Sequence, residues 1–253
     1  MAQRLQGKKA LVTGSTSNIG RAIAVAFAAE GAHVVVSGRS ETKGADVVAE
    51  IRAAGGRADF VQADLDGSST ASRALAAEAT DVLGHVDILV NNAGIYPQSS
   101  TPTADDEVFD RVFGVNVKAP FFLTQALTPG MTGGGVIINL GSWITRLGVP
   151  SGAIYSSSKG AMETMTRAWS SEFAEQGIRV NAISPGVIAS ADWDPGTRTA
   201  ADVMMKGTPA GRSGAPEAIA AAAVYLASDE AAFVHGIVLD VDGGRTGVAV
   251  VAA

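Results

Sequence analysis

Two side chains in the second half of the chain have types and spacing suited to proton transfer. Tyr155 and Lys159 stand four residues apart, and an apolar pattern at helical spacing continues after them through Met162, Met165 and Trp169. Residues at i and i+4 share one face of a helix, so the phenol and the ammonium would lie on the same side. A phenol has a pKa of about 10, and a nearby cation favours its ionised form. Tyr155 is therefore a candidate acid and base, although a packed ring beside a solvated amine would give the same pattern.

The composition excludes several classes of protein. The 253 residues include no cysteine, which excludes disulfides, thiolate metal sites and a cysteine nucleophile. A net charge of −6 argues against a nucleic-acid-binding surface. No apolar run approaches the roughly 18 residues that span a membrane, and the polar start of the chain shows no signal peptide. The histidines are isolated from further metal ligands, so we expect a soluble cytoplasmic protein without a metal site.

A strand, a glycine turn, a helix and a second strand open the chain. The sequence predicts them over residues 9–13, 14–20, 21–30 and 32–37, and Gly31 ends the helix. This order within about 30 residues is typical of a dinucleotide-binding unit. The glycines let the backbone approach a pyrophosphate, and the helix N-terminus offers free N–H groups. The flanking strand and helix favour nucleotide binding over a turn that is merely a tight connection.

The alternation of helices and strands continues to the end of the chain. Gly114 and Pro120 are expected to interrupt one of the later helices, and no linker or repeat divides the sequence. We expect an α/β fold with a single domain over residues 1–253, a Rossmann-type, doubly wound parallel sheet of about seven strands with helices on both faces. The further strands are predicted at 58–62, 86–90, 135–140, 177–184 and 235–241, the further helices at 45–54, 69–83, 108–127, 153–175 and 216–227, and one long irregular stretch at 187–214.

Several motifs, taken together, resemble the short-chain dehydrogenase/reductase family over nearly the whole chain. They occur in the order and spacing of that family, and the likeness extends to members that reduce 3-oxoacyl chains and members that oxidise glucose. One departure is Asn18, where the family usually has a glycine. Asparagine tolerates left-handed backbone angles better than most residues, so we expect the turn to survive. The motifs are Thr13–Gly20, Asn91–Gly94, Asn116, Ser142, Tyr155 with Lys159, and Asn181–Gly186.

The resemblance implies a role for each of four catalytic residues. Tyr155 would be the general acid in carbonyl reduction and the base in alcohol oxidation. Ser142 would hydrogen-bond the substrate oxygen and stabilise the developing oxyanion. Lys159 would lower the pKa of Tyr155 and hold the nicotinamide ribose, and Asn116 would hold a water that links Lys159 to solvent. Without the resemblance to this family, Ser142 and Asn116 would be interpreted as ordinary turn residues.

The choice of cofactor depends on the end of the second predicted strand. Members that prefer NAD carry an acid where this chain has Gly38, and the neighbouring Arg39 could form a forked ion pair with a 2′-phosphate. We therefore expect NADP, with NAD as the alternative if Arg39 is only an exposed loop residue. The other cofactor contacts implied by the resemblance are Gly14, Ser15, Thr16, Asn18, Ile19, Gly20, Ser40, Asp64, Leu65, Asn92, Ala93, Gly94, Tyr155, Lys159, Pro185, Gly186, Ile188 and Ser190.

Three aromatic residues are candidates for substrate contacts, together with Ser142. The stretch 187–214 matches the substrate loop of the family and contains Trp193, while Trp143 follows Ser142. Tyr96 comes just after the asparagine turn. All three fall on loops at the carboxyl ends of predicted strands, where ligands bind in open α/β sheets. Each aromatic could be a structural anchor instead.

The expected function is hydride transfer between NADP(H) and a small, free carbonyl or alcohol compound. The absence of basic residues from 125–134 argues against the first alternative, a reductase of 3-oxoacyl chains on an acyl carrier protein. The second alternative is a nucleotide-binding protein without turnover, against which the Ser–Tyr–Lys–Asn set argues. The resemblance implies a homotetramer, and the apolar tail 248–253 favours burial against another subunit. The sequence does not name the substrate.

Overall fold

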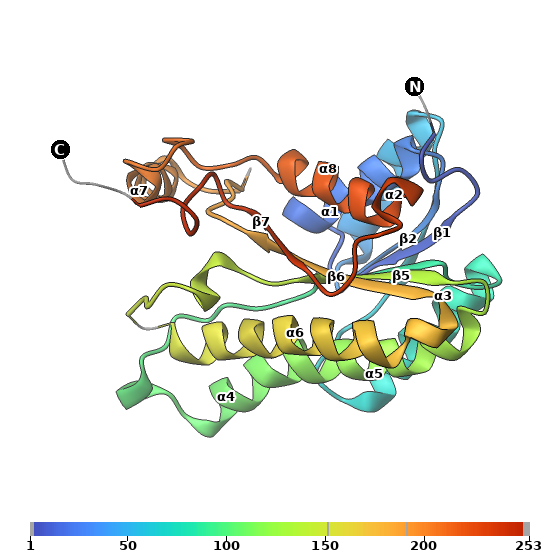
Figure 1. Ribbon diagram of the computed structural model, residues 1–253, viewed down its shortest axis with the longest axis horizontal. Helices are drawn as coiled ribbons and strands as arrows, with labels where there is room; N and C mark the ends of the chain where they lie inside the picture. The colour runs from blue at the N-terminus through green and yellow to red at the C-terminus, as the bar shows by residue number, and fades with distance from the viewer. Residues whose placement is uncertain (1–2, 151, 191, 250–253) are drawn as a thin grey trace.

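Within residues 3–150, 152–190 and 192–249, which this computed structural model describes, seven parallel strands form one sheet (Figure 1). Their order is β3-β2-β1-β4-β5-β6-β7, so the chain builds outwards from β1 to one side and then from β4 to the other. The doubly wound parallel sheet that we expected is therefore confirmed. The strands are β1 (Lys9–Val12), β2 (His33–Gly38), β3 (Arg57–Gln62), β4 (Ile88–Asn91), β5 (Gly135–Leu140), β6 (Ile178–Pro185) and β7 (Val238–Val241).

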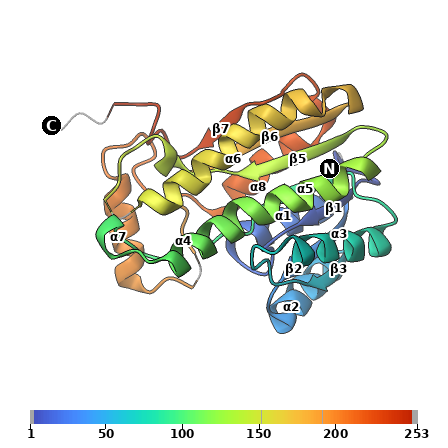
Figure 2. The same ribbon diagram turned by 90° about the horizontal axis from the view of Figure 1, so that it is seen from below.

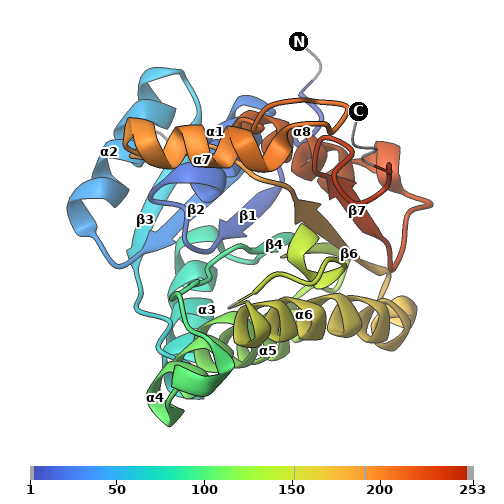
Figure 3. The ribbon, with the colours of Figure 1, turned by 90° about the vertical axis from the view of Figure 1, so that its left-hand side faces the viewer.

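Helices cover both faces of the sheet (Figures 1 and 3). The strands alternate between two hydrophobic cores: Ala10 and Val12 of β1 face one layer of helices, and Leu11 faces the other. Burial on both faces explains why these strands read as continuous apolar runs. The first layer consists of α1 (Asn18–Ala29), α2 (Glu41–Ala53) and α8 (Pro216–Ala227), and the second of α3 (Ser69–Leu83), α5 (Ala119–Leu127) and α6 (Ala153–Glu172).

The segment expected as one interrupted helix over 108–127 is helical throughout. Gly114 does not break it, because α4 (Asp106–Phe113) passes into a π-helical turn over Gly114–Lys118 and then into α5. Pro120 lies at the start of α5, where a missing N–H is tolerated. Single π-helical turns often occur at functional sites, and this one contains Asn116.

The prediction of an irregular stretch over 187–214 is wrong for its middle part, which forms α7 (Pro195–Met205). Asp194 caps this helix, and its carboxylate accepts hydrogen bonds from the N–H groups of Gly196 at 2.8 Å and Thr197 at 3.1 Å. Pro195 is the first helical residue, a position that proline favours. This start signal was present in the sequence. Helix α7 lies at the same end of the molecule as α4 (Figure 2), beside the carboxyl ends of the strands.

The start of α2 also differs from the prediction, since the helix begins at Glu41 and not near residue 45. Ser40 caps it by accepting a hydrogen bond from the Lys43 N–H at 3.3 Å. Gly44 lies inside this helix, and a Cβ there would stand 2.2 Å from the ring of Phe60, so the position has no room for a side chain. The other element boundaries fall within three residues of those expected. No helix among the described residues has the length and apolarity needed to cross a membrane.

Candidate active site

Two adjoining cavities lie at the carboxyl ends of the strands. The first has a volume of about 810 Å³ and runs along the glycine turn towards the ends of β2 and β3. The second has a volume of about 450 Å³ and lies between α6 and the 187–214 stretch. Tyr155 and Asn92 line both. A long ligand in the first cavity and a smaller one in the second would therefore meet at Tyr155.

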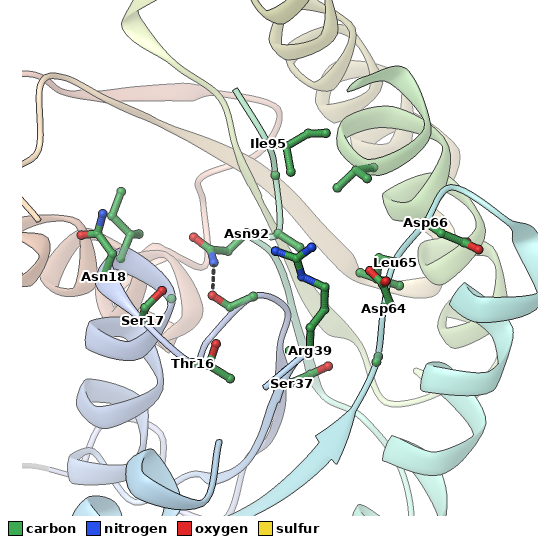
Figure 4. A pocket seen from close by; sticks show the side chains of 18 of the residues that line it. Thr16, Ser17, Asn18, Ser37, Arg39, Asp64, Leu65, Asp66, Asn92 and Ile95 are labelled. Atoms are coloured by element: carbon green, nitrogen blue, oxygen red, sulfur yellow. Dashed lines mark hydrogen bonds between the residues drawn. The ribbon is translucent and has the colours of Figure 1, made fainter. Parts of the chain in front are cut away.

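The glycine turn after β1 is packed so closely that two of its positions must be glycine. A Cβ at Gly20 would lie 2.3 Å from the Gly14 carbonyl oxygen and 2.5 Å from the Asn92 amide nitrogen. Gly14 has a φ of +61° and faces the backbone of the Asn91–Gly94 turn. The Asn92 side chain donates to the carbonyls of Thr13 at 2.8 Å and Gly14 at 3.0 Å (Figure 4). Asn92 thus fixes the shape of the turn.

Asn18 adopts the left-handed backbone conformation that we expected at this position. Its φ is +45°, and it is the one non-glycine residue in the described part of the chain with a positive φ. Asn18 is the first residue of α1, and the capping residue Ser17 makes no side-chain hydrogen bond to that helix. The first N–H groups of α1 therefore open towards the first cavity without a side-chain acceptor. Such a helix end suits an anionic group like a pyrophosphate.

The far end of the first cavity carries a free cation. Figure 4 shows the Arg39 side chain between Thr16 on one side and Asp64 and Leu65 on the other. Arg39 is exposed, and its guanidinium forms no ion pair with any residue that the structure describes. At Gly38 a Cβ would stand 2.7 Å from the Thr16 methyl carbon, so Thr16 occupies the space that an acidic side chain would need.

Three of the predicted cofactor residues, Ser15, Ser40 and Ser190, line neither cavity. Ser15 is fully buried, and its hydroxyl donates to the Val12 carbonyl and accepts from the Ser37 N–H at 2.9 Å. Ser40 caps α2, as described above. The structure therefore gives Ser15 and Ser40 roles in holding backbone segments. The other predicted cofactor residues line one or both cavities: Gly14, Thr16, Asn18, Ile19, Gly20, Arg39, Asp64, Leu65, Asn92, Ala93, Gly94, Tyr155, Lys159, Pro185, Gly186 and Ile188.

The Tyr155 hydroxyl is set in a mainly apolar environment. Burial raises the pKa of Tyr155, and a hydrogen bond with the Ser142 hydroxyl opposes that rise. We expected Lys159 to lower this pKa, but its ammonium lies 5.9 Å from the centre of the Tyr155 ring and burial prevails. Tyr155 is accordingly held as the neutral phenol, which is the form that can donate a proton. Ser142, which is 7% exposed, is the polar neighbour that this hydroxyl shares with a ligand in the second cavity.

Lys159 is buried beneath the same site. Its ammonium donates to the Leu140 carbonyl at 2.8 Å, at the end of β5. Burial lowers the pKa of Lys159 to about 8. Gly94 leaves the space above it open, since a Cβ there would lie 3.4 Å from the Lys159 ammonium and 3.3 Å from the Asn116 amide oxygen. The amine thus faces the junction of the two cavities.

The side-chain amide of Asn116 forms hydrogen bonds with other residues of the protein. Its amide oxygen accepts from the Ile95 N–H at 2.8 Å, and its amide nitrogen donates to the Ile95 carbonyl and the Ser158 hydroxyl, each at 3.0 Å. Ser158 in turn donates to the Tyr155 carbonyl at 2.7 Å. Asn116 therefore ties the loop after β4 to the helix that carries Tyr155 and Lys159. The water-holding role implied by the resemblance stays a prediction.

Aromatic rings from three segments, those of Tyr96, Trp143 and Trp193, line the second cavity, and their contact with a substrate stays a prediction. The rings of Tyr96 and Tyr155 lie 4.5 Å apart, centre to centre. Trp143 is 8% exposed and belongs to a hydrophobic cluster against which Trp193 packs. Sequence reasoning missed the aliphatic remainder of this wall, because it comes from loops without a motif and from α7. These residues are Ile144, Val149, Val187 and Met204. It likewise missed Ser17, Asp66 and Arg111 in the first cavity.

Comparison with known proteins agrees with this architecture. A family model described as enoyl-(acyl carrier protein) reductase matches residues 14–246. An uncharacterized oxidoreductase of Methylorubrum extorquens is 41% identical over 249 residues, covering 95% of this chain and 98% of that protein. A 3-oxoacyl-(acyl-carrier-protein) reductase of Thermotoga maritima is 35% identical over 244 residues, covering 95% and 98%. The solved structure of a short-chain dehydrogenase/reductase from Serratia marcescens superimposes with a TM-score of 0.90 at 32% identity, covering 96% and 100%.

The chain therefore belongs to the short-chain dehydrogenase/reductase family. It is an oxidoreductase that works with a nicotinamide cofactor, NAD or NADP, and the family resemblance stated from its motifs is confirmed. We call the first cavity the cofactor cleft and the second the substrate cleft from here on.

Proposed function

We propose that this protein transfers a hydride between NADP(H) and a small, free carbonyl or alcohol compound, with Tyr155 as general acid and base. The observation that carries the proposal is the position of the Tyr155 hydroxyl. Tyr155 lines both clefts where they meet, and Ser142 and the buried amine of Lys159 line the substrate cleft beside it. A cofactor in one cleft and a substrate in the other would both lie beside the group that moves the proton.

The residues of the site divide the chemistry among them. When bound, the nicotinamide cofactor supplies or accepts the hydride. In carbonyl reduction Tyr155 donates its proton to the substrate oxygen, and the Ser142 hydroxyl stabilises the negative charge that develops there. In alcohol oxidation Tyr155 accepts the proton, and the positive charge of Lys159 favours the phenolate. Asn116 keeps α6 in register with the loop after β4, so that these groups stay together.

The preference for NADP is supported by the charges at the far end of the cofactor cleft. The Arg39 guanidinium lies there without an ion-pair partner among the described residues, and Gly38, beside the Thr16 methyl group, stands where an acid would repel a 2′-phosphate. The glycine turn and the uncapped start of α1 fit a pyrophosphate. Asp64 and Leu65 would flank the adenine ring, and Pro185, Gly186 and Ile188 would hold the nicotinamide end, whereas Ser190 lines neither cleft.

The alternative of an acyl-carrier substrate has some support from the names of the matched family model and of the Thermotoga maritima relative. Docking of an acidic carrier needs basic side chains near the entrance. Three basic residues, Arg198, Lys206 and Arg212, lie on or after α7, but none lines the substrate cleft. We therefore favour a free substrate. A non-catalytic nucleotide-binding protein is the weaker alternative, because binding alone requires neither Tyr155 nor Lys159.

We also propose a homotetramer in the cytoplasm, where the nicotinamide cofactors are abundant. Large apolar side chains are exposed on two separate surfaces: Phe109 and Phe121 on α4 and α5, and Phe233 and Ile237 before β7. Two such surfaces suit the two or more interfaces of a tetramer. Of the tail 248–253, Val248 is 51% exposed, and residues 250–253 lie outside the described part. Sedimentation that shows a monomer at micromolar concentration would contradict this assembly.

An absorbance assay at the nicotinamide band tests the proposed function. A panel of free ketones and alcohols is combined with NADP(H) and with NAD(H), and a 3-oxoacyl carrier protein is included at low and high salt. We expect turnover of free compounds with NADP(H). Binding of cofactor without turnover of any compound would favour the nucleotide-binding alternative. Efficient turnover of the carrier-bound chain that falls steeply with salt would favour the acyl-carrier alternative.

A further inference from the structure

The substrate cleft offers almost no charge to a ligand. Among the described residues that line it, Lys159 carries the only ionisable charge expected at neutral pH. The uncharged polar side chains that line it are Asn18, Asn92, Tyr96, Ser142 and Tyr155, and the reacting oxygen would bind beside Ser142 and Tyr155. The remaining wall is aliphatic and aromatic: Ile144, Val149, Val187, Ile188, Trp193 and Met204.

Three cations in or near the substrate cleft interact with other groups of the protein. Lys159 donates to the Leu140 carbonyl. Arg245 lies outside the cleft, where its guanidinium stacks 4.3 Å from the centre of the Trp143 ring and donates to the Met204 carbonyl. Arg146 forms an ion pair with Asp240. A carboxylate or phosphate carried by the substrate would thus be desolvated in the cleft without a partner, which is strongly unfavourable.

The aromatic walls favour a flat, apolar substrate. Tyr96 comes from the loop after β4, Trp143 from the loop after β5, and Trp193 from the segment before α7, and all three line the cleft. Trp143 is held from outside by Arg245, so its ring is a fixed surface. Ring faces pack well against other rings, in offset-stacked or edge-to-face arrangements. Hydroxyl groups of a sugar or sugar acid that face the aliphatic and aromatic part of the wall would find no hydrogen-bond partner there.

We propose that the substrate is an uncharged ketone or secondary alcohol carried on an apolar ring, alicyclic or aromatic. This inference rests on the proposed function. In the reductive direction the carbonyl carbon gains a hydride from the reduced nicotinamide cofactor and the carbonyl oxygen gains the proton of Tyr155, which yields the secondary alcohol. The oxidative direction reverses both transfers. The ring lies among the aromatic walls while its oxygen reaches Ser142 and Tyr155.

A matched set of three ketones separates the contributions of charge and shape. Methyl 4-oxocyclohexanecarboxylate is a neutral ring ketone, its free acid is the same ring with a negative charge, and propyl 4-oxopentanoate is a neutral open chain of equal carbon number. For each compound, kcat/KM is measured with NADPH. Binding is measured separately by calorimetry in the presence of NADP⁺, with which a ketone cannot be reduced.

We expect the ring ester to exceed the acid at least tenfold in both kcat/KM and affinity, and to exceed the open-chain ester several-fold. Equal or better use of the acid would overturn the inference, although its turnover would still support the proposed function. Failure of every compound to bind would overturn the inference as well. The expected order in binding without any reduction would support the assignment of the cleft and count against the proposed chemistry.

A charge introduced into the wall sharpens this test. Trp193→Arg places a cation in the substrate cleft and should shift the ratio of acid to ester by at least tenfold in favour of the acid. Val82→Arg adds the same charge on α3, where Val82 is 43% exposed and lines neither cleft, and should leave the ratio unchanged. Equal ratios in the two variants would show that the wall does not contact the substrate, and would overturn the inference.

Discussion

The cofactor cleft and the substrate cleft meet at Tyr155, yet they are built from different kinds of contact. The cofactor cleft is shaped by backbone: Gly20 has no room for one added carbon, and Asn92 locks the turn through two main-chain carbonyls. The substrate cleft is shaped by side chains, such as Trp143 and Trp193, from segments far apart in the sequence. Substitutions in the second cleft can therefore change the substrate without disturbing the first.

The contrast extends to charge. The cofactor cleft opens to an uncapped helix N-terminus at one point and to the free guanidinium of Arg39 at another, both of which suit phosphate groups. Among the described residues, the one charged group that lines the substrate cleft is the buried amine of Lys159. This difference in charge fits a cofactor whose phosphate groups lie in the cofactor cleft and whose uncharged reacting end lies at the junction. The following changes, taken from the largest expected effect to the smallest, probe it.

Lys159→Met should remove a pH dependence of stability that burial creates. The pKa of Lys159 is lowered from 10.5 to about 8 in the folded protein, so between these pH values the unfolded chain binds a proton that the folded one does not. Stability conferred by this site therefore rises with pH across that window. We compare the free energies of unfolding of the wild type and the variant. The wild-type value minus the variant value should increase by about 3 kcal/mol between neutral pH and pH 10.5.

Chemical denaturation of both proteins across that pH range measures the difference. Lys43→Met, which removes an exposed lysine of α2, is the matched control and should show a much smaller change. A difference between wild type and Lys159→Met that does not vary with pH would contradict the burial of a titrating amine at the junction.

The cofactor preference should move towards NAD(H) by at least tenfold in the triple variant Thr16→Ala, Gly38→Asp, Arg39→Ala. Removal of Arg39 takes away the phosphate partner, and the aspartate repels the 2′-phosphate. Thr16→Ala is needed because the new Cβ would otherwise stand 2.7 Å from the Thr16 methyl carbon. The ratio of kcat/KM for the two cofactors is the measurement. Arg39→Lys keeps the charge and should keep the NADP(H) preference, whereas a wild type that prefers NAD(H) would refute the assignment.

Arg245→Ala should weaken substrate binding more than it slows the chemical step. Arg245 contacts Trp143 from outside the substrate cleft and also holds the Met204 carbonyl of α7. Loss of a cation–π contact of this kind predicts a rise in KM of about threefold to tenfold, with little change in kcat. Arg245→Lys should restore part of the binding, and Arg57→Ala, an exposed arginine of β3, is the control. An equal fall in kcat with KM unchanged would place Arg245 in a different role.

The parts of the molecule that the sequence predicted are those fixed by local chemistry. The glycine turn, the left-handed Asn18 and the alternation of strands and helices follow from backbone constraints and apolar runs in the sequence. Helix α7 was also predictable, because Asp194 and Pro195 form a standard helix start. The contact of Arg245 with Trp143 was not, since it joins residues that only the fold brings together.

The pKa of Tyr155 also depends on contacts that could not be predicted from the sequence. The spacing to Lys159 predicts a cation on the same helix face, which by itself would lower this pKa. Burial raises it instead, and burial depends on the Tyr96 ring and on the loops around it. Sequence patterns thus predicted the candidate reacting groups but not the environment that sets their protonation.

The proton-transfer role of Tyr155 is the central claim, and Tyr155→Phe tests it most directly. Turnover of a ketone substrate and the dissociation constant of NADPH are measured in parallel for wild type and variant. The variant should bind NADPH as tightly as the wild type and keep its melting temperature, while kcat falls by about 10²–10⁴. A loss of less than about tenfold in kcat, with NADPH binding intact, would contradict the role assigned to this hydroxyl.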